Sequence, residues 1–245
     1  MEVEVLYEDN ETLVINKPVG LVVNRADSVS SPTVQDWVES RSEIASSSTP
    51  RNDDKLFRER SGICHRLDKE TSGCLVIAKS PEALKYYLKL FKKRELTKEY
   101  VSLVHGKVEP DEGTVVLPVK RSRADREKWQ VHYGGKRAET SWTVLKRFRY
   151  ENSEHWKNSL TYLRLNLRTG RTHQIRVHLS FLGWPIFADE RYLNKELANK
   201  DRELLSHHFL HAERIVLKSF SGKEIKVEAP LPPDCDLLLK GLGSY

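Results

Sequence analysis

The sequence predicts an α+β protein with a largely antiparallel central sheet, and three observations lead to that class. Its 245 residues are enough to bury a sizeable core in one large domain. Runs that are apolar or alternate with period two, as strands do, outnumber the segments with helical spacing. Short turns rich in Gly, Pro and Ser separate several of these runs, as hairpins require. Hairpins combined with few helices are typical of the α+β class.

The first half of the chain contains strand patterns and two helix starts. A short helix is expected from Pro32 to Ser40. Ser80 followed by Pro81 predicts the start of a second helix, because a serine N-cap and a first-turn proline both favour initiation. One face of that helix is apolar, with Leu84, Tyr87, Leu88 and Phe91. The strands expected here cover residues 3–7, 12–16, 21–24, 63–67 and 74–79, with a KPVG turn at residues 17–20.

The second half is richer in strand patterns. Leu163, Leu165 and Leu167 alternate with polar residues, which is the clearest period-two signal in the chain. A turn at residues 169–170 precedes a helix expected over residues 173–181. Residues 215–229 indicate a strand, a turn and a second strand. The other strands expected here cover residues 100–104, 114–119 and 138–145.

The chain is interpreted as one domain over residues 1–245, and several protein classes are excluded. Residues 42–60 are polar and rich in Ser, Asn and Asp, which indicates a surface insertion. No apolar run approaches the roughly 20 residues that a membrane span needs. The acidic start of the chain does not resemble a secretory signal. Three cysteines without a framework spacing predict a reduced protein in the cytoplasm.

Positive charge is concentrated in two runs. The chain has 41 Lys and Arg against 35 Asp and Glu, a formal net charge of +6. The run from Lys85 to Lys98 lies on the second expected helix. The run from Lys120 to Arg137 is interleaved with Trp129, His132 and Tyr133. Each run alone could be a solvated face, but two such runs together favour a polyanion such as nucleic acid.

Several familiar sites are absent from the sequence, which contains no GxxxxGK[ST], GxSxG or HExxH motif. His207, His208 and His211, together with Cys235, are the only candidate metal cluster. They lack partners at ligand spacing, so we interpret them as packing residues.

Two polar segments remain as candidates for chemistry. Residues 65–73 (HRLDKETSG) place Asp68 beside several hydrogen-bond donors, although Asp68 could also be only a turn residue. Residues 169–179 (TGRTHQIRVHL) begin the expected helix. In helical geometry Arg171 and Arg176 would both project near one end of it. A carboxylate beside such an arginine stays ionised, because the opposite charge favours its charged form.

These segments resemble the signature of the RluA family of RNA pseudouridine synthases. The resemblance rests on residues 62–73 (GICHRLDKETSG), 13–23, 98–100 (KEY) and 169–186 (TGRTHQIRVHL through GWPI), in the family's order. It implies a mostly antiparallel central sheet in two subdomains, flanked by helices and crossed by a basic cleft. It also implies isomerisation of uridine to pseudouridine in structured RNA, with rRNA expected before tRNA and no metal or organic cofactor.

The resemblance assigns roles residue by residue. Asp68 matches the catalytic aspartate, which either attacks the sugar or abstracts a sugar proton to give a glycal. Tyr100 matches a tyrosine that stacks on the target base. Arg66 would fill the gap left by the extruded nucleotide. Arg176 would pair with Asp68, with Arg171 as the alternative. Ala188 departs from the family, which usually has glycine there.

The resemblance also bears on partners and organisation. The partner is RNA, no membrane is involved, and a monomer is the simplest expectation. The chain opens on the catalytic domain, so no separate N-terminal RNA-binding module is expected. The alternative is a non-catalytic RNA-binding or ribosome-assembly protein on the same fold. The intact Asp68, Tyr100 and Arg176 argue against that alternative, because a protein that only binds RNA has no need of a carboxylate facing it.

Overall fold

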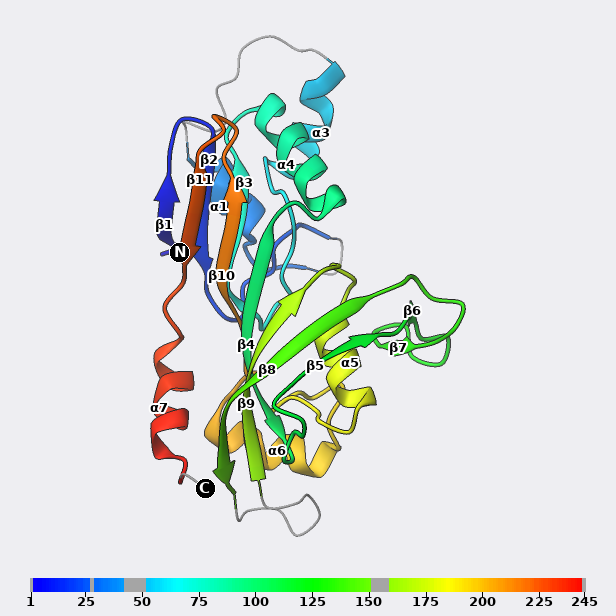
Figure 1. Cartoon of the computed structure of the whole chain (residues 1–245). Helices are drawn as coiled ribbons and strands as arrows, with labels where there is room; N and C mark the ends of the chain where they lie inside the picture. Colours follow the sequence, from blue (N-terminus) through cyan, green and yellow to red (C-terminus); the bar gives the residue numbers. More distant parts are fainter. Residues whose placement is uncertain (1, 27–28, 42–51, 151–158, 244–245) are drawn as a thin grey trace. The chain divides into compact units, whose positions relative to one another are not determined.

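The computed structural model describes residues 2–26, 29–41, 52–150 and 159–243, and it divides into two compact units (Figure 1). Unit 1 comprises Met1–Thr97 and Ala212–Pro230. Unit 2 comprises Lys98–His211 and Leu231–Tyr245. Each unit has its own strands and helices, which confirms the predicted α+β class. None of the described helices is long and apolar enough to cross a membrane.

Unit 1 is built on a sheet whose central strand is fully buried. The strand order is β1-β2-β3-β10, and β11 pairs with β10. Every residue of β3 is buried, and its Leu75 and Ile77 face Ile15 and Leu13 of β2 in antiparallel register. The strands are β1 (Glu4–Glu8), β2 (Thr12–Lys17), β3 (Ser72–Ala78), β10 (Leu210–Lys218) and β11 (Glu224–Glu228).

Two helices of unit 1, α1 and α4, begin after capping residues. Helix α1 (Val34–Glu39) starts with a capping box between Thr33 and Asp36, and α3 spans Asn52–Arg60. Helix α4 (Pro81–Lys93) has Ser80 as its N-cap, accepting from the Ala83 N–H. Its Leu84 and Tyr87 are buried, as the apolar stripe predicts, while the lysines off that stripe are exposed.

Two predictions in unit 1 need correction. Residues 21–24 are not a strand, and in residues 63–67 only Ile63 forms a bridge, to Ile77. Most apolar residues of both runs are buried, a requirement that loops share with strands. Of the expected insertion at residues 42–60, residues 42–51 lie outside the described residues. Asn52–Arg60 is helical, and Phe57 is its buried residue.

In unit 2 the antiparallel strands follow the order β4-β9-β8-β5. A separate hairpin, β6 with β7, follows β5 in the chain. Leu163 and Leu165 of β9 are buried, so the predicted alternation is confirmed there. The strands are β4 (Thr97–His105), β5 (Glu112–Val116), β6 (Val119–Arg121), β7 (Trp129–Val131), β8 (Glu139–Arg149) and β9 (Ser159–Leu167).

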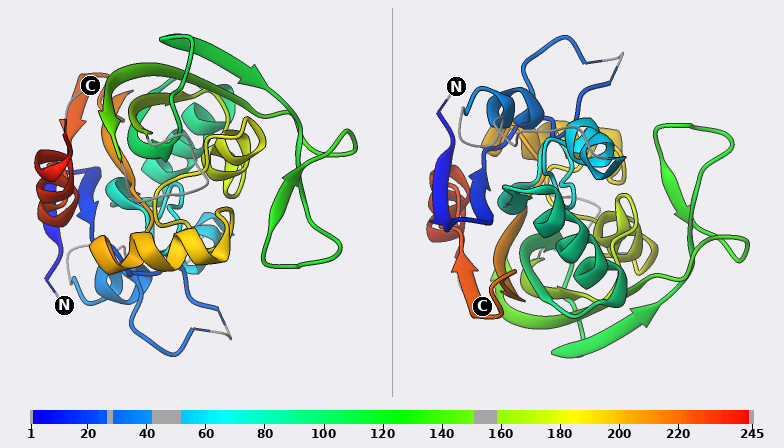
Figure 2. Two further views of the ribbon diagram at one scale, coloured as in Figure 1. Left: turned by 90° about the horizontal axis from the view of Figure 1, so that it is seen from below. Right: turned by 90° about the horizontal axis from the view of Figure 1, so that it is seen from above.

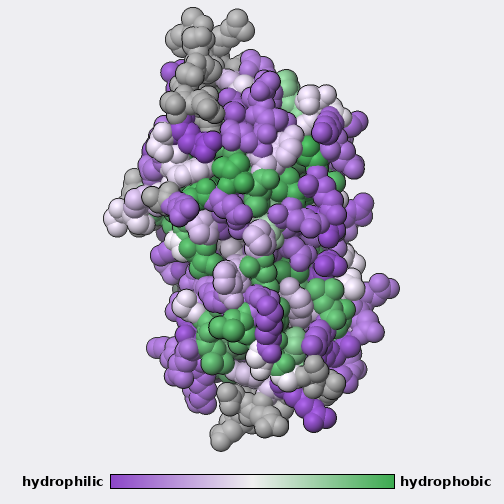
Figure 3. Space-filling view, turned by 90° about the vertical axis from the view of Figure 1, so that its left-hand side faces the viewer, coloured by the Kyte–Doolittle hydropathy of each residue, from purple (hydrophilic) through white to green (hydrophobic). Residues whose placement is uncertain are grey.

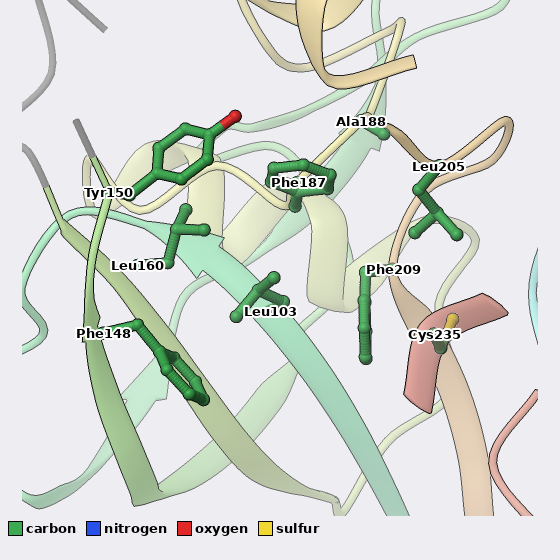
Figure 4. Packing of buried hydrophobic residues seen from close by; sticks show 9 residues of the cluster. All are labelled: Leu103, Phe148, Tyr150, Leu160, Phe187, Ala188, Leu205, Phe209 and Cys235. Atoms are coloured by element: carbon green, nitrogen blue, oxygen red, sulfur yellow. The ribbon is translucent and has the colours of Figure 1, made fainter. Parts of the chain in front are cut away.

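Unit 2 also has three helices among its described residues, α5 (Gln174–Phe181), α6 (Lys195–Leu204) and α7 (Pro233–Gly241), of which only α5 was predicted. A core cluster that includes Leu103, Phe187 and Phe209 joins the sheet to the segments around α6 and α7 (Figure 4).

On the face of the molecule that Figure 3 shows, hydrophilic side chains surround small groups of hydrophobic ones.

Candidate active site

Asp68 lies in unit 1, in the loop that leads into β3. The Cys64 N–H donates to Val76 O at 3.1 Å and the Thr71 N–H donates to Asp68 O at 3.1 Å, so both ends of the loop are held by backbone bonds. Leu67 is buried, Asp68 is half-buried, and Arg66 is exposed. Leu67 therefore anchors the loop, while Asp68 stays partly accessible and Arg66 is exposed beside it.

Gly73 shows why the motif ends in glycine. Its φ is +107°, and a Cβ at this position would lie 2.3 Å from the carbonyl oxygen of Ala212 on β10. No side chain fits in that space, and L-residues rarely adopt that backbone conformation. The close approach of β3 and β10 thus requires Gly73, and it sets where the loop of Asp68 joins the sheet.

A buried lysine holds the same loop from the other side. Lys17 is fully buried at the end of β2. Its Nζ donates to the carbonyl oxygens of Pro18 at 2.8 Å, Leu21 at 2.9 Å and Lys69 at 3.0 Å. The Gly20 N–H also donates to Lys69 O, at 2.9 Å. Lys17 therefore ties the KPVG turn to the residue that follows Asp68 in the chain.

The charges of Lys17 and Asp68 interact. Burial lowers the pKa of Lys17 to about 7, and the negative charge of Asp68 acts in the opposite direction. The coupling is reciprocal, so a protonated Lys17 favours the ionised form of Asp68. An ionised carboxylate is what either proposed role of Asp68 in the reaction requires.

In unit 2, Gln174 organises the second motif. Its Oε1 accepts from Thr169 Oγ1 at 2.6 Å and from the Arg171 N–H at 3.0 Å. Its Nε2 donates to Glu139 O at 3.0 Å and to Thr140 Oγ1 at 2.9 Å. All four bonds are made by one buried amide, so the turn before α5 is locked onto β8.

The expectation that Arg171 and Arg176 both project from one end of the same helix is wrong for Arg171. Helix α5 begins at Gln174, and His173 before it has a φ of 54°, so Arg171 lies outside the helix. The Nε of Arg171 donates to Arg137 O at 3.2 Å. The positive φ at His173 breaks the helical spacing that the prediction assumed.

Arg176 is held by a buried carboxylate within unit 2. Its Nε and Nη2 donate to the two oxygens of Asp189, each at 2.8 Å. Arg176 is 5% exposed and Asp189 is not exposed. Burial alone would raise the pKa of Asp189, but the hydrogen bonds and charge of Arg176 outweigh it and hold that pKa below its usual value. The bidentate pair fixes the plane of the guanidinium.

Tyr192 connects this pair to the β6–β7 hairpin. Its ring lies 5.1 Å from the guanidinium carbon of Arg176. Its Oη accepts from the Trp129 N–H at 2.9 Å and lies 2.8 Å from Nδ1 of His173. One side chain therefore contacts the start of β7, the start of α5 and the buried arginine.

The segment that carries Asp189 is itself braced. Ala188 has a φ of 60°, a left-handed conformation that explains why the family usually has glycine there. Its N–H donates to Asp201 Oδ2 at 2.9 Å, and the same oxygen lies 2.7 Å from Nε2 of His105. Because His105 and Asp201 are both fully buried, this contact holds Ala188 against the core of unit 2.

The predicted site residues divide between the units. Asp68 and Arg66 belong to unit 1, whereas Tyr100, Arg171 and Arg176 belong to unit 2. Tyr100 is buried on β4, opposite Leu165 of β9. The pairing of Asp68 with Arg176 or Arg171, and the contact of Tyr100 with the target base, stay predictions.

The two basic runs occupy exposed positions in different units. On α4, Lys85, Lys89, Lys92 and Lys93 are exposed. In unit 2 the second run forms the β6–β7 hairpin, where Arg121 lies 5.4 Å from the ring of Trp129. Both runs are therefore available to a polyanion, as their charge predicts.

One group in the described part of the chain could hold a metal ion. It comprises His207, Asp234 and Cys235, whose ligand atoms lie within 4.8 Å of one another. It differs from the cluster considered from the sequence, because His208 and His211 are absent from it and Asp234 joins it. Nε2 of His207 lies 2.9 Å from Asp234 Oδ2, and burial raises the pKa of Cys235 well above its usual range. Without a metal ion, these contacts make Cys235 a buried thiol packed beside an ion pair.

Sequence reasoning missed three residues that position the site, namely Lys17, Asp189 and Tyr192. Lys17 carried a usable signal, because a charged side chain ends an otherwise buried strand. Asp189 is 13 residues from Arg176, and Tyr192 is 63 residues from Trp129. At those distances local pattern carries no information about the contact.

Comparison with known proteins identifies the family. Residues 11–181 match the family model described as RNA pseudouridylate synthase. The uncharacterized RNA pseudouridine synthase YlyB of Bacillus subtilis (strain 168) is 32% identical over 242 residues, covering 99% of this chain and 73% of that protein. Ribosomal large subunit pseudouridine synthase D of Blochmanniella floridana is 32% identical over 252 residues, covering 98% and 73%.

A solved structure confirms the expected fold. Human RNA Pseudouridylate Synthase Domain Containing 1 has a TM-score of 0.72 at 23% identity, covering 100% of this chain and 89% of the human one. Together with the sequence matches, this likeness confirms the resemblance that the motifs predicted. The chain belongs to the RNA pseudouridylate synthase family and is an RNA pseudouridine synthase.

Proposed function

We propose that this enzyme isomerises specific uridines in structured RNA and that Asp68 is its catalytic carboxylate. The N1–C1′ glycosidic bond is broken, the base turns, and C5 is joined to C1′, so that the product is an isomer of the substrate. Asp68 either attacks C1′ or removes a sugar proton to give a glycal. Both routes need an ionised carboxylate beside the ribose.

The loop of Asp68 is the observation that carries this proposal. It combines a half-buried aspartate with the fully buried Lys17, whose charge favours the ionised form of that aspartate. A protein that only binds RNA gains nothing from an acidic group held in a loop of this kind, because RNA phosphates repel it. A catalytic role accounts for both the acid and the cation that supports it.

For the substrate we favour rRNA over tRNA. Several relatives are named ribosomal large subunit pseudouridine synthase D, among them the proteins of Blochmanniella floridana and Pseudomonas aeruginosa. The exposed lysines of α4 and the basic β6–β7 hairpin suit the phosphates of a structured RNA. All three cysteines are free and buried, which suits a reducing compartment, so we assign the reaction to the cytoplasm. We further propose that the enzyme acts as a monomer.

Extrusion of the target nucleotide is part of the proposal. The glycosidic bond is out of reach while the base is stacked, so the nucleotide has to swing out at a cost of a few kcal/mol. Arg66 is exposed on the same loop as Asp68 and is our candidate for the side chain that fills the vacated space. Tyr100 is our candidate for the residue that stacks on the extruded base.

Tritium release tests the proposal directly. RNA carrying tritium at uridine C5 loses the label when C5 is joined to C1′, so the full chain is incubated with separate rRNA and tRNA fractions. We expect release from rRNA, and a loss of at least about 100-fold in Asp68→Asn. Unchanged RNA binding by Asp68→Asn would show that the variant is folded. Substantial release by Asp68→Asn would contradict the assignment.

The same assay identifies the partner of Asp68. Arg176→Lys keeps a cation beside Asp189 but loses the bidentate geometry, whereas Arg171→Ala leaves Arg176 untouched. We expect Arg176→Lys to lose most of the release and Arg171→Ala to retain it. The reverse result would make Arg171 the partner.

A further inference from the structure

An almost fully exposed aromatic side chain lies in the turn that follows β7, beside the start of β6. Tyr133 is 94% exposed, which makes it the most exposed of the large hydrophobic side chains in the described residues. Its ring is stacked on that of His132, with centroids 4.5 Å apart and planes at 23°. An aromatic ring left in water in this way contributes nothing to the core, so a role outside folding has to account for it.

The stacked pair is held in place by the backbone. The His132 N–H donates to Pro118 O at 2.9 Å, and the Gly135 N–H donates to His132 O at 2.8 Å. The Gly134 N–H donates to Nδ1 of His132 at 3.0 Å, which orients the imidazole ring. Tyr133 therefore lies on a platform that is ordered before any ligand arrives, and little conformational entropy is lost when one binds.

One cation lies beside the platform, and further cations are exposed along the same segment of the chain. A Cβ on Gly134 would lie 3.7 Å from Nζ of Lys120, so that ammonium is next to the turn. The other basic residues of the hairpin and its flanks are exposed, namely Arg121, Arg123, Arg126, Lys128, Lys136 and Arg137. The exposed residues beside Tyr133 in the chain include Gly134 and Lys136 rather than apolar side chains. An accessible aromatic ring combined with a positively charged segment is typical of proteins that bind single-stranded nucleic acid.

The base of the hairpin is anchored on the segments that hold Arg176. Val119, Ala138 and Val177 form a buried cluster, against which Trp129 and Tyr192 pack. The Trp129 N–H donates to Tyr192 Oη, as described above. The hairpin thus extends from a fixed base within unit 2, and the segment that contains it projects from that unit in both views of Figure 2.

We propose that Tyr133, supported by His132, is a stacking platform for one unpaired base of the RNA substrate, a base other than the uridine that is isomerised. Stacking is favoured over base-edge recognition because the accessible surface is a ring face, and every base offers a matching π-face. The platform would select RNA with an unpaired base near the target site. This inference rests on the proposed function and deepens it by naming the substrate class.

The test measures RNA binding in the Asp68→Asn background, so that no turnover occurs. The probe is a stem-loop RNA with 2-aminopurine in the loop, and the comparison RNA is the same stem as a fully paired duplex. We expect Tyr133→Leu to bind the stem-loop about 5- to 100-fold more weakly, because the stacking of one base is lost. Tyr133→Phe keeps the ring, so it should bind like the parent and quench the 2-aminopurine.

Salt dependence and a matched control separate stacking from charge. Tyr133→Leu should leave the slope of log affinity against log salt unchanged, whereas Lys128→Gln should reduce it. Phe220→Leu makes a similar change at an exposed aromatic on the turn between β10 and β11 in unit 1, and it should have no effect.

Three outcomes would overturn the inference. They are equal affinities of the Leu and Phe variants, an equal loss with stem-loop and duplex, and unquenched 2-aminopurine. Capture of a protein by Tyr133 with no change in RNA binding would also overturn it, in favour of a protein surface. Tritium release by the enzyme with Asp68 intact reports on the proposed function independently. If tritium is released but substitution of Tyr133 does not change RNA binding, only the stacking inference is refuted. If no RNA releases tritium, the proposed function itself is refuted.

Discussion

The two units each bury a cation in a segment that carries a predicted site residue, but they stabilise that cation differently. In unit 1, Lys17 is surrounded by the carbonyl oxygens of Pro18, Leu21 and Lys69. In unit 2, Arg176 meets the carboxylate of Asp189 in a bidentate pair. In its protonated form Lys17 meets carbonyl oxygens and no carboxylate among these three partners, so its charge acts on Asp68, while the charge of Arg176 is balanced by Asp189.

The difference indicates a division of roles. A lysine ammonium has three donors, and three carbonyl groups can satisfy all of them without cancelling its charge. A guanidinium has a planar fork that one carboxylate can orient. We infer that Lys17 acts on Asp68 mainly through charge and loop position. Asp189 acts through the orientation of Arg176, so both are positioning residues.

The largest effect is expected when the carboxylate of unit 2 is removed. Asp189→Asn leaves Arg176 buried without its counter-charge, and we expect a loss of about 3–5 kcal/mol in the free energy of unfolding. Denaturant unfolding followed by tryptophan fluorescence measures it, because Trp129, Trp142 and Trp184 all lie in unit 2. The control is Glu127→Gln, which breaks the exposed pair with Arg191 and should cost less than about 1 kcal/mol.

The same variant has a defined pH dependence. Because the folded-state pKa of Asp189 lies below its usual value, its stabilising contribution is present above about pH 4. It is lost as the pH falls through the folded-state pKa and the carboxylate is protonated. The stability difference between the parent and Asp189→Asn should therefore shrink in acid. A difference that stays constant down to pH 2 would contradict the ion-pair explanation.

A smaller effect is expected in unit 1. Lys17→Met removes the donor from three carbonyl groups, and we expect a loss of about 2–3 kcal/mol at neutral pH together with reduced tritium release. Lys79→Met is the matched control, since Lys79 pairs with Glu8 near the surface of the same unit. Hydrogen exchange of the KPVG turn locates the effect. If both variants lose equal stability, the three hydrogen bonds from Lys17 to carbonyl oxygens contribute no more to stability than a surface ion pair.

The dependence of stability on alkaline pH tests whether Lys17 is charged in the folded protein. Lys17 has a folded-state pKa of about 7, below the 10.5 of a free lysine. Between these values the unfolded chain holds a proton that the folded chain has released, so the stability of the parent rises with pH. Relative to Lys17→Met, the rise should approach about 1.4 kcal/mol per pH unit above pH 7. No relative rise up to pH 9 would mean that the ammonium form persists in the folded protein.

The smallest effect concerns the link between the hairpin and Arg176. Tyr192→Phe removes the acceptor of the Trp129 N–H and the partner of His173, at a cost of about 1 kcal/mol. Hydrogen exchange at the Trp129 amide should become about 5-fold faster. Tyr133→Phe removes an exposed hydroxyl from the same unit and is the control. Unchanged exchange at Trp129 would show that the hairpin is anchored by apolar packing alone.

Local patterns predicted the elements whose signals are self-contained. The buried strand β3, the alternation of β9 and the start of α4 all depend on residues within one element. The predictions failed where apolar runs packed without forming strands, at residues 21–24 and 63–67. Helix α6 was missed although its N-cap, Asn194, accepts from two backbone N–H groups, because its first turn is polar.

The candidate site, like the fold, was predicted where the signal lies within a local motif. The motifs located Asp68 and Arg176, and the resemblance supplied their roles, which the structure leaves as predictions. The cluster of His207 with Asp234 and Cys235 was only partly foreseen, because Asp234 arrives from the distant helix α7. The sequence likewise gave no sign that His173 would adopt a left-handed conformation and end the expected spacing of the arginines.

The sequence by itself determined the family, the order of most strands and the segments that carry charge, because each depends on residues close together in the chain. Only the tertiary structure decided which groups meet. It placed Asp189 on Arg176, Lys17 beneath the loop of Asp68, and Tyr192 against Trp129. Such contacts arise because a buried charged or polar group is costly in free energy unless it is paired or hydrogen-bonded. The fold of the chain determines which partner lies within hydrogen-bonding distance.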